Sequence, residues 1–183
     1  MRKSRFWLGL FIWIYPMTGE CGVFEVGSGF SYSRSAYNAG STSSTRSWNA
    51  SFGYYFTQDS QVMFSYQDTT THDIVPNVQD IQYRDRVYSV NLVYHLLGEG
   101  SLVRPYVRGG VGQLNRDATG TYQGGFSPPG RLDQVTVIGG LGLRVRVTQR
   151  VALKAEATSY LTGGSVSTWQ DNFVVNVGGS FYF

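Results

Sequence analysis

The sequence has little of what several common classes of protein depend on. One cysteine rules out a disulfide framework, and two histidines without a Cys/His cluster give no metal site. No stretch is long and apolar enough to cross a bilayer as a helix, and no run of Lys and Arg indicates a nucleic-acid partner. No phosphate-cradling glycine loop precedes a helix, so we expect no cofactor.

Glycine and aromatic residues are abundant instead. The chain has 23 Gly, 4 Trp, 13 Tyr and 11 Phe, against 15% charged residues. This balance is poor for helices and suits strands, tight turns and interfacial aromatic belts. Because 183 residues without a linker tract make a single domain, the composition predicts one all-β domain.

The start of the chain differs in kind from the rest. Three basic residues precede an apolar run over residues 6–15, which is the pattern of an export signal peptide. We expect residues 1–22 to be removed by cleavage near residue 21 or 22, leaving a domain over residues 23–183. Lipidation of Cys21 is the alternative, although Glu20 departs from the small residue that a lipobox needs.

Segments of alternating apolar and polar residues recur along the domain, and the connections between them alternate in length. Short connections are typical of the periplasmic side of an outer-membrane barrel and long ones of the outside. The pattern predicts an eight-stranded antiparallel up-and-down transmembrane β-barrel. The expected strands are 23–33, 46–56, 61–67, 86–96, 102–114, 134–146, 151–161 and 168–183. The short connections are 57–60, 97–101 and 147–150, and the long ones 35–45, 68–85, 115–133 and 162–167.

Most of these segments have one apolar face without charges. Trp48, Ala50, Phe52, Tyr54 and Phe56 share such a face in the second segment. In a membrane this face meets lipid, and every backbone group finds a partner only if the sheet closes. A soluble lipocalin-like barrel, with its apolar face inward, has the same periodicity. Small residues on the opposite face and the sorted connections favour the membrane barrel with a narrow, crowded lumen.

The last strand carries a characteristic ending. Phe183 and Phe181, preceded by Gly178 and Asn176, resemble the C-terminal assembly signal of bacterial outer-membrane β-barrels. Residues 104–112 resemble the Pro-Tyr-Val…Gly-x-Gly strand of the small outer-membrane barrels, the superfamily of the OmpA transmembrane domain, opacity-type proteins and Ail/Lom-type adhesins. The resemblance implies a monomer in the outer membrane of a Gram-negative bacterium, inserted by the barrel-assembly machinery. It implies a fold and an assembly route, not an activity.

Eight titratable side chains fall on the face opposite to lipid, most of them near the short connections. Because this lumen is only wide enough for side chains, we expect a salt-bridged plug rather than a pore. Glu25 and Glu156 should bridge Arg144, Arg104 or Lys154, since unpaired charges there cost on the order of several kcal/mol each. The excess of cations leaves an anion site or a gated path as the alternative to ordinary packing. The eight residues are Glu25, His95, Arg104, Arg108, Arg144, Arg146, Lys154 and Glu156.

Arginines also fall near the expected outer rim, beside a girdle of aromatic residues. Guanidinium groups bind phosphate through paired hydrogen bonds, so we expect contacts with lipopolysaccharide there. The arginines are Arg46, Arg84, Arg86, Arg116 and Arg131. The expected girdle consists of Trp48, Tyr66, Tyr88, Tyr160 and Trp169.

The role expected from these features is structural and surface-interacting, in adhesion or envelope integrity, with polar loops that contact a host or envelope protein. A small-solute channel and a lipid A-modifying enzyme are the alternatives. For the enzyme, His72 lies near Asp68 and Asp73, with Ser65 in the adjoining strand, which are residue types used in acyl transfer. Their spacing matches no family pattern, so we expect no catalytic centre.

Overall fold

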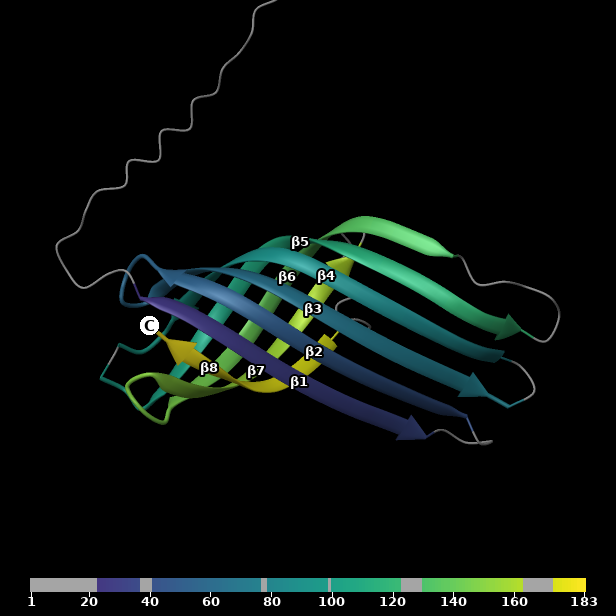
Figure 1. Ribbon diagram of the computed structural model, residues 1–183, viewed down its shortest axis with the longest axis horizontal. Helices are drawn as coiled ribbons and strands as arrows, with labels where there is room; N and C mark the ends of the chain where they lie inside the picture. Colours follow the sequence, from purple (N-terminus) through teal and green to yellow (C-terminus); the bar gives the residue numbers. More distant parts are fainter. Residues whose placement is uncertain (1–22, 37–40, 77–78, 99, 123–129, 163–172) are drawn as a thin grey trace, which may run out of the picture.

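Eight antiparallel strands form a closed barrel in the computed structural model (Figure 1). The structure describes residues 23–36, 41–76, 79–98, 100–122, 130–162 and 173–183, and the expected signal peptide lies outside them. The strands are β1 (Phe24–Ala36), β2 (Thr42–Tyr55), β3 (Ser60–Val75), β4 (Gln79–His95), β5 (Val103–Tyr122), β6 (Arg131–Arg146), β7 (Val151–Thr162) and β8 (Phe173–Tyr182). Their number and order confirm the predicted up-and-down barrel.

Each strand pairs with the next one along the chain, and β8 closes the barrel on β1. The closing ladder joins residues 25–30 to residues 177–182. Phe24 and Phe183 extend it with two backbone hydrogen bonds of 2.9 and 3.0 Å. Both ends of the barrel domain therefore lie at the same end of the barrel as the tight connections (Figure 1). We call this the turn end, defined by connections 56–59, 96–102 and 147–150, and the opposite one the loop end.

The two faces of the sheet are inverted relative to those of a soluble barrel. Along β4, Asn91 and His95 point inward and are each 1% exposed, whereas Leu92 and Tyr94 point outward and are 62% and 53% exposed. Apolar side chains thus cover the outside, and polar ones fill much of the inside. This arrangement excludes the lipocalin-like alternative, which needs an apolar interior. None of the described residues forms a helix long and apolar enough to span a bilayer.

The strands run further toward the loop end than the sequence predicted. A strand over 61–67 and a loop over 68–85 were expected, yet β3 and β4 stay paired until Val75 meets Gln79. β5 likewise extends into the expected loop 115–133. The apolar outer stripe stops well before these points, whereas the hydrogen-bond ladder continues through residues with high strand propensity such as threonine. The apolar pattern therefore located the lipid-facing band and not the strand ends.

A glycine lets β8 approach β1 closely at the closing ladder. A Cβ atom on Gly178 would lie 2.0 Å from the backbone oxygen of Ser28, so no larger residue fits. Outside the barrel, the Phe183 ring stacks on that of Phe24 with centroids 5.9 Å apart. Of the residues expected to form the assembly signal, Phe181 and Phe183 lie outside, and Gly178 and Asn176 face the lumen.

Candidate functional site

A cluster of hydrogen bonds around Glu25 fills the turn-end half of the lumen. The carboxylate, 2% exposed, accepts from Nη2 of Arg144 at 2.7 and 2.9 Å and from Nζ of Lys154 at 3.2 Å. The Tyr55 hydroxyl and the Gln61 amide each donate to it at 2.9 Å. These side chains come from β1, β2, β3, β6 and β7, so the cluster crosses the lumen.

Arg144 ties this cluster to the far wall. Its Nη1 atom donates to the Tyr55 hydroxyl and to Nε2 of His95. Because a guanidinium group can only donate, these contacts fit a His95 ring that accepts at Nε2 and donates from Nδ1 to the Asp59 carbonyl, 3.1 Å away. The guanidinium carbon also lies 5.6 to 5.8 Å from three tyrosine ring centroids, within cation–π range. The rings are those of Tyr55, Tyr106 and Tyr182.

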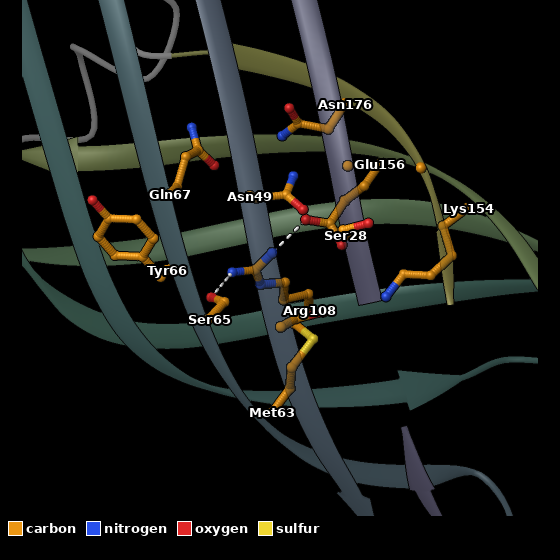
Figure 2. A pocket seen from close by; sticks show the side chains of 13 residues that line it. Ser28, Asn49, Met63, Ser65, Tyr66, Gln67, Arg108, Lys154, Glu156 and Asn176 are labelled. Atoms are coloured by element: carbon orange, nitrogen blue, oxygen red, sulfur yellow. Dashed lines mark hydrogen bonds and ion pairs between the residues drawn. The ribbon is translucent and has the colours of Figure 1, made fainter. Parts of the chain in front are cut away.

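A second ion pair joins Arg108 to Glu156 further along the lumen, and Figure 2 shows Arg108 between Glu156 and Ser65. Nη2 of Arg108 donates to the Ser65 hydroxyl at 2.8 Å. Glu156 also accepts from the hydroxyls of Tyr106 at 2.8 Å and Thr158 at 2.7 Å. The cavity beside this pair has a volume of about 30 Å³, which is enough for only about two water molecules.

Two further arginines face the lumen nearer the turn end. Arg104 donates to the Asp59 carboxylate at 2.8 Å and to the carbonyls of Leu97 and Gln58 at 2.9 and 3.0 Å. Arg146 is half-buried, and its side chain makes no hydrogen bond or ion pair to another described residue. All eight residues of the expected network therefore lie on the inner face, but Arg146 stands apart from it.

The partner of Glu156 differs from the expected ones, Arg144, Arg104 and Lys154. Its ion-pair partner is Arg108, because the strand register places Arg108 opposite Gly140, which in turn lies opposite Thr158, two residues from Glu156. The same register places Tyr106, Gly142 and Glu156 side by side on β5, β6 and β7. A Cβ atom on Gly142 would lie 2.1 Å from the Tyr106 ring. Because Gly142 has no side chain, Tyr106 reaches across β6 to β7. A glycine that faces polar residues on both neighbouring strands indicates that a side chain can reach across its strand in this way. The sequence reveals such a glycine only once the strand register is known.

The loop-end half of the lumen is filled differently. Its centre is an apolar cluster of side chains on β4 to β8, in which Tyr160 donates a hydrogen bond to Gln67. Tyr160 therefore faces inward and is not part of the outer girdle, whereas Trp169 lies outside the described residues. Above the cluster, Arg116 binds Asp85 at 2.6 and 2.7 Å on the inner face. The cluster consists of Val87, Leu114, Ile138, Tyr160 and Val174.

The other four rim arginines lie on the outer face of the barrel. Three of them pair with aspartates: Arg84 with Asp68 at 2.7 Å, Arg86 with Asp117, and Arg131 with Asp133 at 3.1 Å. Arg46 is exposed on the same face. Directly below them, rings of the expected girdle touch, with centroids of Tyr66 5.1 Å from Trp48 and 4.9 Å from Tyr88.

The residues considered for acyl transfer do not come together. His72 binds Asp80 at 2.7 Å near the loop end. Ser65 lies on the inner face, where it contacts Ser89 and Arg108. Because residues 65 and 72 of one strand differ by an odd number, their side chains lie on opposite faces of the sheet. The described residues also contain no group of three His, Cys, Asp or Glu side chains that could hold a metal ion.

Comparison with known proteins gives a family match and several similar structures. Residues 25–181 match the family described as the OprF membrane domain. The N-terminal β-barrel domain of Pseudomonas aeruginosa OprF is 22% identical with a TM-score of 0.61, covering 88% of this chain and 97% of that one. OprG of the same organism is 16% identical with a TM-score of 0.57, covering 89% and 96%.

Ail of Yersinia pestis, in a complex with the heparin analogue sucrose octasulfate, is similar as well. It is 18% identical with a TM-score of 0.56, covering 88% of this chain and 99% of that one. A search of curated protein sequences found no match. At identities below 25%, the structural likenesses speak for the fold alone.

Proposed function

This chain belongs to the OprF membrane domain family and resides in the bacterial outer membrane, and we propose that it is a structural, surface-exposed barrel whose lumen is closed by side chains. An even number of strands puts both ends of the barrel domain on one side, and the short connections there are typical of the periplasmic side. The loop end then faces the cell exterior. In this role the barrel supports the envelope and carries its exposed rim as a binding surface, without conducting solutes.

The observation that carries this proposal is the meeting of Glu25 and Arg144 across the lumen. They stand on β1 and β6, which are not neighbours in the sheet, and their side chains are 2% and 4% exposed. The Arg108–Glu156 pair and the apolar cluster lie behind them toward the loop end. A solute would have to pass three successive layers of packed side chains, which favours a closed lumen over the channel alternative.

Conductance in planar lipid bilayers tests the closed lumen. We expect the refolded protein to show no stepwise conductance, because no continuous water path crosses the packed layers. The double substitution Glu25→Ala and Arg144→Ala removes the crossing and should produce small steps. Arg150→Ala, on an exposed turn at the same end, is the matched control and should stay silent. Steps in the unaltered protein that the double substitution leaves unchanged would contradict the proposal and favour the channel.

Lipopolysaccharide is the proposed partner of the outer rim. Arg46, Arg84 and Arg86 stand directly above the rings of Trp48 and Tyr66, where phosphate groups of the outer leaflet lie over acyl chains. The Arg84 side chain is 55% exposed even though it pairs with Asp68, so its guanidinium group remains within reach of a phosphate. A host or envelope protein would be contacted from this same rim.

Retention of lipopolysaccharide during purification tests this contact. Replacing Arg46, Arg84 and Arg86 together by Gln should lower the lipopolysaccharide that stays with the detergent-solubilised barrel by more than half. The same replacement at Arg150, on the periplasmic side, should leave the amount unchanged. Equal retention by both variants would remove lipopolysaccharide from the list of partners.

A further inference from the structure

The lumen opens at the turn end into a cavity of about 500 Å³. Tyr55, Tyr182 and Arg144 line it together with Arg104 and Arg146, and turn residues such as Gln149 complete the wall. Its size lies within the range of ordinary small-molecule sites, in contrast to the 30 Å³ cavity deeper in the lumen. In a barrel with its turn end in the periplasm, this cavity faces the periplasmic solution.

The charge around this cavity is one-sided. Three guanidinium groups line it, and none of its lining residues among the described ones is acidic. The nearby carboxylates are already engaged, because Glu25 is buried behind Arg144 and Asp59 binds Arg104. The guanidinium group of Arg146 has no partner among the described residues, although the residue is half-buried. A half-buried cation without a counter-charge is unfavourable, so an anion entering here gains more than it would at an exposed arginine.

We propose that this cavity binds a small oxyanion, a phosphate or carboxylate group of a periplasmic solute, with Arg146 as its main contact. The planar guanidinium group presents paired donors that match the oxygens of either group. Arg104 contributes positive charge while its own hydrogen bonds stay in place. The side-chain amides of Gln58 and Gln149 in the wall supply neutral donors. Because the site lies at the mouth of the barrel, it would bind its anion whether or not the lumen conducts solutes.

Calorimetric titration of the detergent-folded barrel at low ionic strength tests the site, with pyrophosphate and succinate as separate probes. We expect saturable binding of one probe molecule per barrel, and the probe that binds more tightly identifies phosphate or carboxylate as the preferred group. Arg146→Gln should weaken binding about tenfold or more, the loss expected for one charged hydrogen-bonding partner. Arg146 holds no other described residue in place, so this variant should still fold, which heat-modifiable gel migration checks.

Arg150→Gln is the matched control, since Arg150 lies on the exposed turn between β6 and β7 at the same end and does not line the cavity. It removes the same charge and should change the affinity less than twofold. If Arg146→Gln and Arg150→Gln weaken binding equally, the anions sense only the general charge of this end and the site does not exist. Absence of saturable binding of both probes to the unaltered barrel would overturn the proposal as well.

Discussion

The two halves of the lumen are filled by different mixtures of side chains. In the turn-end half, Glu25 and Arg144 anchor a network of charges, tyrosines and amides, beside a small apolar cluster of Met63, Val93 and Tyr106. In the loop-end half, an apolar cluster around Leu114 and Ile138 packs like the core of a soluble protein. Both fill the same narrow tube. An inside-out barrel as narrow as this one has a filled interior, while the chemistry of the filling changes along its axis.

The two fillings should respond differently to damage. A buried ion pair is sensitive to the loss of one partner, because the remaining charge stays in a site that water reaches poorly. An apolar cluster loses transfer free energy and gains a cavity, and part of that cavity collapses. The charged half should therefore tolerate single substitutions least, although it is the half that opens toward water at the turn end.

Glu25→Gln should have the largest effect. It leaves Arg144 and Lys154 without their common counter-charge and should lower the free energy of unfolding by about 3–5 kcal/mol. Urea unfolding in lipid vesicles, followed by Trp fluorescence, measures this change. Adding Arg144→Met, which replaces the stranded cation by an apolar side chain, should restore part of the loss. If Glu25→Gln lowered the free energy of unfolding less than Leu114→Ala does, the turn-end half would be the more tolerant of the two.

Leu114→Ala should have an intermediate effect. Removing this buried side chain, 3% exposed, from the loop-end cluster should cost about 2–4 kcal/mol through lost transfer free energy and a cavity. Leu141→Ala is the control, because Leu141 is 65% exposed on the lipid face and lipid fills the space that it leaves. The same vesicle assay applies. Equal losses at both positions would mean that the loop-end cluster is not packed as a core.

Arg116→Gln should have the smallest effect. It breaks an ion pair in the loop-end half and so tests whether the depth of a charge pair, and not only its presence, sets the cost of breaking it. Arg116 and Asp85 form an ion pair inside the loop-end half, but their side chains are 34% and 22% exposed. Water reaches this pair, so we expect a loss of only about 1 kcal/mol or less. If Arg116→Gln lowered the free energy of unfolding as much as Glu25→Gln does, the cost of breaking an ion pair would not depend on how deeply the pair is buried.

The sequence allowed the inner face to be predicted well, because alternation fixes which side chains face the same way. Glu25, Lys154 and Glu156 could be assigned to one side of the sheet without knowing any neighbour. Which of them meet could not be predicted, since the Arg108–Glu156 pair depends on the register of β5, β6 and β7. The hydrogen bond from Tyr106 to Glu156 depends in addition on the space above Gly142.

Two other differences between the predicted and the observed structure concern the end of β3 and the orientation of Tyr160. The strand β3 continues to Val75 because backbone pairing persists after the apolar stripe has ended. Tyr160 was expected at the lipid interface because tyrosine is common there, yet its place in the alternation of β7 turns it inward to Gln67.

The closing ladder gives the barrel a preferred line of rupture. β4 and β5 stay paired over the whole of residues 79–95, whereas among the described residues β1 and β8 pair over 25–30 and 177–182, extended by Phe24 and Phe183. Both ends of the barrel domain lie beside this short ladder, on the periplasmic side. A pulling force applied to either end would therefore act first on the strand pair with the shortest ladder. We expect β1 and β8 to separate before any other pair of neighbouring strands.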